Sequence, residues 1–251
     1  MKFFKPDGTL FNDKNEFVVY YSKKYYLNSE KVKSSNGKPV IKSSEFIENE
    51  IDELLKSGIK DENDIIHIIA WKTGKIKHSD SEKTKKFIFH SDWSIDEKNK
   101  VYNIKRYGKE FDISNLAKFI VSNVDRLYKQ SKSEPQEVIN ELKNNSPNGI
   151  GTVYLITLLY FISRGEYPIY DRFAKIAIDA ILFDEKPYDD VKYSELPNKN
   201  DKKFSQVIDN YKKEYVDKLK EVFGDNYKSN RDIDRALWVY GHLFNSYKSG
   251  C

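Results

Sequence analysis

The sequence predicts a mainly α-helical protein with a small β element in its N-terminal half. Apolar side chains recur at helical spacing through most of the chain after about residue 44. Residues that favour helix starts and ends, such as Pro135 and Gly224, stand at the borders of these stretches. Two short β-branched and aromatic runs, residues 86–90 (KFIFH) and 101–104 (VYNI), are typical of strands instead.

The composition is that of a folded protein. The chain has 251 residues, 39% hydrophobic and 33% charged, enough for one substantial core or two small lobes around a cleft. Aromatic residues make up 14%, whereas disordered chains are poor in them. The net charge of +4 is weak evidence for a nucleic-acid partner. Cys251 is the only cysteine, which excludes a disulfide framework and zinc or iron–sulfur clusters built on thiolates.

Neither the N-terminal residues nor the most apolar stretch of the chain indicates a membrane segment. The first residues, MKFFKPDGTLF, are interrupted by Pro6, Asp7 and Gly8 and lack the apolar run of a signal peptide. The most apolar stretch, residues 153–162 (VYLITLLYFI), is too short to span a bilayer. We therefore expect a soluble cytoplasmic protein, a monomer with no membrane partner.

The N-terminal part of the chain is expected to combine helices and a loop. Residues 17–27 (FVVYYSKKYYL) suit either a strand or a buried helix, and residues 34–39 suit a turn or loop. The next apolar pattern is helical and ends at Gly58. A second helix begins at the cap Asp61 and ends at Gly74.

The following segment is polar and then β-like. Residues 72–86 are rich in lysine, which suits either contact with phosphate or a solvated loop. The runs 86–90 and 101–104 flank the turn-like sequence DEKNK and are expected to pair as a small hairpin.

The remainder reads as helices. They are predicted over residues 115–129, 135–143, 152–164, 172–183, 202–223 and 232–247. We expect an N-terminal region, residues 1–110, of mixed α and short β structure and a helical region, residues 111–251. The two are expected to be interleaved into one compact unit.

The sequence between two of these helices, SPNGIG, has the features of a phosphate clamp. Gly149 and Gly151 flank Ile150, and glycine permits tight turns and close approach by another backbone. Ile150 can anchor the turn in the core. The amides from Thr152 onward begin a helix, so they lack intrahelical partners and lie at the positive end of the helix dipole.

The sequence PIYD follows one helix later. Pro168 breaks the chain, and Asp171 then leads an apolar-striped helix. The stripe consists of Phe173, Ile176, Ala177, Ala180 and Ile181. A carboxylate at a helix start is favoured in its ionised form. One helix thus separates the predicted clamp from a carboxylate.

Together these residues resemble the signature of the helix-hairpin-helix DNA glycosylases. That family has a hairpin similar to L-P-G-V-G, then a helix, then an aspartate in a V-D or P-x-D context. GIG at residues 149–151 matches the hairpin, and Asp171 falls at the family's catalytic aspartate without a gap. Asn148 stands where the family has proline, and Pro147 lies one residue earlier.

The resemblance covers residues 146–182 and extends weakly to residues 235–244 (RALWVYGHLF), which are similar to the closing helix of such domains. It implies a two-lobed helical DNA-glycosylase-like fold that contains the helix-hairpin-helix. It also implies double-stranded DNA as partner, held through Gly149, Ile150, Gly151 and Thr152.

In this resemblance Asp171 is the catalytic residue, which orients or deprotonates water or stabilises an oxocarbenium-like sugar. One departure changes the chemistry. Bifunctional members carry a lysine two residues after the second hairpin glycine, where this chain has Val153. Val153 has no amine to form a Schiff base. The resemblance therefore implies a monofunctional hydrolase, or an enzyme whose lysine lies elsewhere.

An extruded base stacks on aromatic rings, so we look for a base pocket among the aromatic residues. The candidates are Tyr154, Tyr170, Trp238 and Tyr240. Any single aromatic residue is more often part of a core. Tyr170 is the most informative candidate, because it adjoins Asp171.

No cofactor and no metal site is expected. The four histidines, His67, His78, His90 and His242, lack the spacing of metal ligands. A monovalent cation at the hairpin is the one alternative that the resemblance leaves open.

The sequence thus favours a DNA base-excision glycosylase that hydrolyses the N-glycosidic bond of a damaged or modified base. Two alternatives stay open. A non-catalytic helix-hairpin-helix protein would bind nucleic acid without chemistry, and Asp171 would then be only a helix cap. A protein-interaction or defence scaffold would use the fold without either function.

Overall fold

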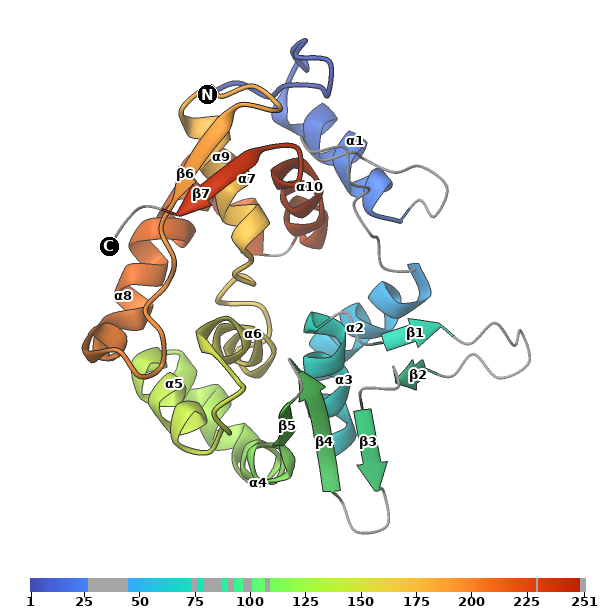
Figure 1. Cartoon of the computed structure of the whole chain (residues 1–251), viewed down its shortest axis with the longest axis vertical. Helices are drawn as coiled ribbons and strands as arrows, with labels where there is room; N and C mark the ends of the chain where they lie inside the picture. The colour runs from blue at the N-terminus through green and yellow to red at the C-terminus, as the bar shows by residue number, and fades with distance from the viewer. Residues whose placement is uncertain are drawn as a thin grey trace. The chain divides into compact units, whose positions relative to one another are not determined.

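The structure, a computed structural model, describes residues 1–26, 45–73, 76–78, 87–89, 93–96, 101–106, 109–228 and 230–248. As expected, it is mainly α-helical with a few short strands (Figure 1). Contacts between residues divide the chain into two compact units. The terminal unit comprises Met1–Ser44, Pro168–Leu196 and Asp209–Cys251, and the central unit comprises Glu45–Tyr167 and Pro197–Ile208. The boundary expected near residue 110 falls inside the central unit.

The central unit is built around α6 (Thr152–Ile162). Its residues are buried except Val153 and Tyr154, and it is apolar on nearly every side. A helix of this kind must be covered by other elements. The helices α3 (Glu62–Lys72), α4 (Ser114–Ser131) and α5 (Pro135–Asn144) pack against it (Figure 1).

Several helix borders confirm the sequence prediction. The helix α2 (Glu45–Ser57) is followed by Gly58, whose φ is 76°. Asp61 caps α3 through a capping box in which its side chain accepts from the backbone N–H of Asp64. Pro135 occupies the first turn of α5, where its missing N–H costs nothing.

The strand pairing differs from the prediction. β1 (Ile76–His78) pairs with β2 (Phe87–Phe89), and β3 (Trp93–Asp96), β4 (Val101–Arg106) and β5 (Lys109–Asp112) form an antiparallel sheet. The expected hairpin between the runs 86–90 and 101–104 is therefore wrong. β3 is nearer to β4 in sequence, so closing that loop costs less entropy, but its mixed sequence WSID carries little strand signal.

The terminal unit is held by α10 (Arg231–Gly241), which packs against both α1 (Lys14–Tyr26) and α7 (Arg172–Leu182). The sequence of residues 17–27 suited a strand or a buried helix, and the structure has the helix α1 up to Tyr26. The rings of Phe17 and Tyr21 lie 5.0 and 5.1 Å from that of Tyr240. The aromatic richness of this part of the chain therefore goes largely into a core.

The predicted final helix over residues 232–247 is too long. α10 ends at Gly241, and β7 (Asn245–Lys248) pairs in parallel with β6 (Asp190–Tyr193). Gly241 lies directly against the backbone carbonyl of Phe173 in α7, where a Cβ would overlap it. After Gly241 the chain forms β7, which pairs with β6 more than 50 residues earlier in the sequence. The periodicity of apolar residues cannot reveal such a distant partner.

The amphipathic stretch over residues 202–223 is helical but not uniform. It runs as a 3-10 helix Lys202–Gln206, α8 (Val207–Tyr211), a π-helical turn Lys212–Val216 and α9 (Asp217–Phe223). It ends at Gly224, as expected, with a φ of 69°. The contact-based division places the start of α8 in the central unit and its end in the terminal unit.

Some predictions fall outside the described residues. These are the loop 34–39, the helix end at Gly74, most of the basic segment 72–86, His90 and Cys251. No helix in the described part of the chain is long and apolar enough to cross a membrane.

Candidate functional site

The hairpin between α5 and α6 is a tight turn anchored by its central apolar residue. The backbone N–H of Ile150 donates to the carbonyl of Pro147 at 3.1 Å and closes the turn. The Ile150 side chain is buried, as expected of an anchor. Gly151 then caps α6 with an extended backbone, and the helix begins at Thr152.

The hairpin leaves a group of backbone donors unused. Among the residues that the structure describes, the N–H groups of Gly149, Gly151, Thr152 and Val153 donate no hydrogen bond. Gly149, Gly151 and Val153 are partly exposed. Amides at the start of a helix lie at the positive end of its dipole, so an anion is favoured beside them.

The two glycines of the hairpin differ in whether the surrounding structure has space for a side chain. A Cβ on Gly149 would overlap the ring of Phe111 in β5, so internal packing requires glycine there. A Cβ on Gly151 would meet nothing within 4 Å, and its φ of −90° is open to any residue. Packing therefore explains Gly149, whereas at Gly151 it leaves room for a side chain and the capping position is the one internal role.

A later segment ties the hairpin down. The hydroxyl of Thr152 donates to the carbonyl of Pro197 at 2.6 Å. The Lys199 ammonium donates to the carbonyls of Pro147, at 2.6 Å, and Ser146, at 3.4 Å. Lys199 is only 7% exposed. The sequence alone does not indicate this contact, because nothing local pairs Lys199 with a turn some 50 positions earlier.

Lys199 bears on the monovalent cation considered for the hairpin. Such ions bind carbonyl oxygens, and the carbonyls of Pro147 and Ser146 already accept from the ammonium. These two oxygens do not fit a metal ion in this arrangement, and the hairpin carries a positive charge of its own. Burial lowers the pKa of Lys199, and the charge of nearby Lys143 lowers it further. The hairpin thus has two cationic neighbours.

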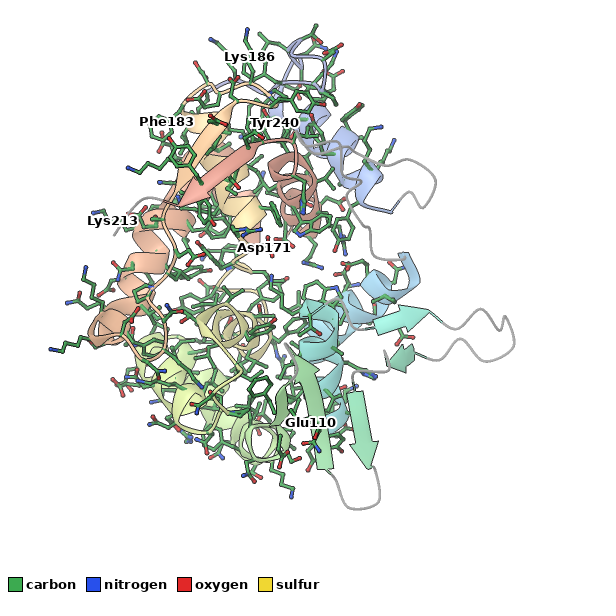
Figure 2. All side chains as sticks on the ribbon, viewed as in Figure 1. Glu110, Asp171, Phe183, Lys186, Lys213 and Tyr240 are labelled. Carbon is green, nitrogen blue, oxygen red and sulfur yellow. The ribbon has the colours of Figure 1, made fainter. Side chains whose placement is uncertain are left out.

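Asp171 is the N-cap of α7 in the terminal unit (Figure 2). One carboxylate oxygen accepts from the backbone N–H of Phe173 at 2.9 Å, and the side chain is half-buried. The preceding residue, Tyr170, is buried, and its hydroxyl donates to the carbonyl of Ser194 at 3.4 Å. Burial raises the pKa of Tyr170, and the charge of Asp171 raises it further. Tyr170 is therefore a neutral neighbour of the carboxylate.

His242, which lacks metal-ligand spacing in the sequence, is a further neighbour of this region. Its ring stacks on Phe173 with centroids 3.4 Å apart, and its Nδ1 lies 2.7 Å from the carbonyl of Trp238. Burial lowers the pKa of His242, while that carbonyl and the charge of Asp171 act in the opposite direction. Only the structure places this imidazole near the charge of Asp171, because 71 residues separate the two in sequence.

The predicted base-pocket residues do not share one environment. Tyr240 and Tyr170 are buried in the terminal unit, and Tyr240 lies among Phe17 and Tyr21. Trp238 is half-buried in the same unit. Tyr154 is half-buried on α6 of the central unit. Trp238 and Tyr154 are therefore partly exposed residues, whereas Tyr240 serves the core.

Each predicted group is assembled within its own unit: the hairpin residues in the central unit, and Asp171, Tyr170 and Trp238 in the terminal unit. In the described ranges, no group of three His, Cys, Asp or Glu residues is placed to hold a metal. No protein-family model, curated protein or solved structure matches this chain. Function is therefore inferred from the residues and their geometry.

Proposed function

We propose that this chain is a helix-hairpin-helix DNA N-glycosylase. It binds double-stranded DNA through the hairpin and hydrolyses the N-glycosidic bond of a damaged or modified base. The observation that carries the proposal is the row of unused backbone donors at Gly149, Gly151, Thr152 and Val153. At Gly151, space is left open that no part of the folded chain needs.

These donors suit a DNA phosphate. The N–H groups point out of the start of α6, and the helix dipole adds favourable charge. The ammonium groups of Lys199 and Lys143 lie close to the hairpin and strengthen attraction to an anion. Such contacts hold the DNA backbone without reading its sequence. The hairpin therefore positions DNA and leaves base selection to other residues.

Asp171 supplies the chemistry in this proposal. Its cap hydrogen bond from the Phe173 N–H fixes the position of the carboxylate at the start of α7. A fixed negative charge stabilises the positive sugar that develops as the base leaves, and it orients the attacking water. Val153 offers no amine, so water rather than lysine takes the base's place on the sugar. The product is a free base and an abasic site.

A second candidate is favoured by one observation. Asp171 already accepts the Phe173 N–H, so a capping role alone is enough to explain an aspartate at this position. In that case the chain binds DNA through the same hairpin and performs no excision. This non-catalytic protein shares every feature of the central unit with the enzyme and differs only at Asp171.

The two candidates separate in one experiment. Duplex oligonucleotides with uracil, 8-oxoguanine, 3-methyladenine or a G·T mismatch are incubated with excess protein, and free base is quantified by chromatography. Binding to the same duplexes is followed by fluorescence anisotropy across a salt series. Base release supports the glycosylase, and salt-sensitive binding without release supports the second candidate. A chain that neither binds nor releases base contradicts both and favours an interaction scaffold.

A further inference from the structure

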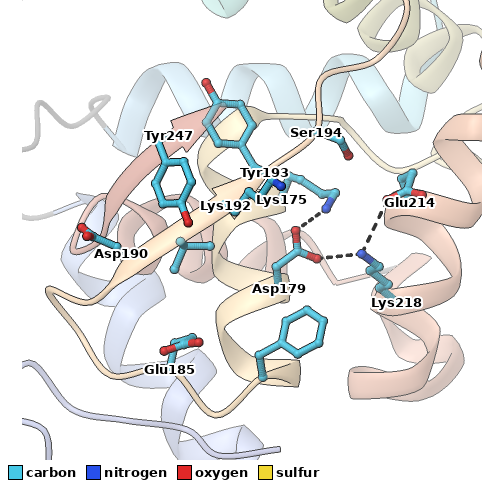
Figure 3. A pocket seen from close by; sticks show the side chains of 12 residues that line it. Lys175, Asp179, Glu185, Asp190, Lys192, Tyr193, Ser194, Glu214, Lys218 and Tyr247 are labelled. Carbon is cyan, nitrogen blue, oxygen red and sulfur yellow. Dashed lines mark hydrogen bonds and ion pairs between the residues drawn. The ribbon is translucent and has the colours of Figure 1, made fainter. Parts of the chain in front are cut away.

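The terminal unit contains a pocket of about 440 Å³ that the proposed function does not use (Figure 3). Side chains of α7, β6, the π-helical turn, α9 and β7 line it. Its ionisable floor consists of Lys175, Asp179 and Lys218, and Figure 3 shows the two lysines directed at the aspartate from different helices.

The carboxylate of Asp179 holds both amines. It accepts from Lys175, one turn earlier on α7, and from Lys218 on α9 at 2.8 Å. Lys175 is 1% exposed and Asp179 is 4% exposed. Glu214, in the π-helical turn, lies 3.7 Å from Lys218. Four ionisable groups thus meet in the lining of one pocket, and two of them are buried.

Stability gives no good reason for this cluster. The other buried residues of α7 are apolar, and replacing a buried ion pair by well-packed apolar residues is often neutral or stabilising. The π-helical turn Lys212–Val216 that carries Glu214 is a second costly feature. Such turns are rare and frequently occur at functional sites. Two unfavourable features beside one pocket indicate a ligand.

The two amines are chemically unlike. Burial lowers the pKa of Lys175, and the adjacent ammonium of Lys218 lowers it further, while Asp179 opposes both effects. Burial also acts to lower the pKa of Lys218, but its hydrogen bond and charge pairing with Asp179 raise the pKa overall. Lys175 therefore loses its proton more readily, and Lys218 keeps its own. A buried amine beside a second cation is an arrangement that activates lysine as a nucleophile.

We propose that Lys175 is the imine-forming amine of a small-molecule site that takes an aldehyde or a ketone. The Lys175 nitrogen attacks the carbonyl carbon, and the carbonyl oxygen takes a proton from Lys218. The nitrogen loses its two protons in turn, through Asp179 to Lys218 and the departing hydroxyl. The oxygen leaves as water, so amine and carbonyl give imine and water without any oxidant or reductant.

The pocket favours a small ligand over DNA. Its volume lies in the range of small-molecule sites. The Lys175 side chain is 2% exposed, too deep for a sugar that is still part of a duplex. Tyr193, Tyr247 and Phe183 line the pocket, and the last two residues are 52% and 72% exposed. A planar or apolar body between such rings with a carbonyl at the floor would use both features.

The test uses the full chain with glycolaldehyde as probe and cyanoborohydride as reductant, which converts an imine to a stable amine. Peptide mass spectrometry reads the extent of labelling at each lysine over time. The exposed Lys213, which does not line the pocket, is the internal reference. We expect Lys175 to be labelled at least about tenfold faster than Lys213, because an activated amine beside a positioned acid gains more than this.

Variants separate a reactive site from a structural ion pair. Lys218→Met should slow labelling at Lys175, whereas the matched control Lys213→Met should leave it unchanged. Circular dichroism confirms the fold of each. Labelling of Lys175 no faster than Lys213 in the wild type overturns the proposal without any variant. Covalent capture of Lys175 by abasic duplex DNA, with none by glycolaldehyde, also overturns it and assigns the amine to DNA instead.

Discussion

The hairpin and the aspartate are the two groups to which the proposed function assigns roles, and the fold accounts for them very differently. Gly151 sits in ordinary backbone geometry with empty space beside it, and the neighbouring N–H groups donate to nothing described in the chain. Asp171 has an internal task, since its carboxylate accepts the Phe173 N–H at the start of α7. What a fold leaves unexplained is the better indicator of an external partner.

The same contrast exists within the hairpin. Gly149 is required by the ring of Phe111, while a side chain at Gly151 would meet no atom of the described chain. Glycine at these two positions looks identical in sequence. Packing explains Gly149, and under the proposed function the free space at Gly151 is where a DNA phosphate approaches.

The largest effect is expected at Asp171, where a cap must be separated from a catalyst. Asn keeps the size of Asp and caps helices equally well, so the melting temperature of Asp171→Asn should stay close to that of the wild type. A neutral amide stabilises no positive charge on the sugar. Single-turnover base release should therefore fall by about a hundredfold or more.

DNA affinity is measured in parallel and should persist or increase, because a negative charge near phosphate is removed. Equal release rates for Asp171→Asn and wild type would remove the catalytic role. The capping role would then be sufficient to explain the aspartate at position 171, whereas the unused donors of the hairpin would still indicate an external partner.

The next effect distinguishes the two glycines. Gly151→Val should keep the fold, at a cost of about 1 kcal/mol for a poorer cap, and weaken DNA binding about tenfold by blocking phosphate. Gly149→Val should instead destabilise the central unit by about 1–3 kcal/mol or more, because its side chain meets Phe111. Anisotropy titrations at low salt and thermal melts measure the two effects. Full affinity in a folded Gly151→Val protein would move the DNA contact away from α6.

A smaller effect is expected at Lys199, whose ammonium holds two hairpin carbonyls. Lys199→Met keeps an unbranched side chain one atom shorter and leaves the carbonyls of Pro147 and Ser146 without this donor. The cost should be about 1–3 kcal/mol in the free energy of unfolding. Exchange of potassium for choline chloride at constant ionic strength should not change the melting temperature of the wild type. A wild-type protein that melts lower in choline would show that a metal ion, not Lys199, supports the turn.

The last prediction is that the protein forms no covalent complex with abasic DNA. With Val153 at the position of the family's lysine, borohydride should not trap the wild-type protein on abasic duplex DNA. A denaturing gel detects a covalent complex, and a bifunctional glycosylase serves as positive control. A strong trapped band would identify another amine at the sugar and end the assignment as a monofunctional enzyme.

Local signals in the sequence predicted much of the helical framework. The Asp61 cap, Pro135 at a helix start and the stop at Gly58 act over a single turn, so their consequences are readable without a structure. The errors concern long-range partners. The parallel pairing of β7 with β6 and the choice of β3 as the partner of β4 depend on which segments meet, and periodicity carries no such information.

The candidate site divides in the same way. The turn, its buried Ile150 and the capping role of Asp171 follow from neighbouring residues and were predicted. Lys199 was missed because its partners lie some 50 positions away. Lys175 and Asp179 left a visible trace, two opposite charges four residues apart on the apolar helix α7, but their meeting with Lys218 is tertiary.

The chain passes between the two units four times, after Ser44, Tyr167, Leu196 and Ile208. Neither unit is therefore a continuous stretch that a protease or a cloning strategy could release intact. A single cut in any one crossing leaves the rest of the backbone joining the units. We therefore expect that neither unit can be expressed as a single continuous fragment and that the two units are inherited together. Recombination that exchanged the first or the last third of the gene would alter both units at once.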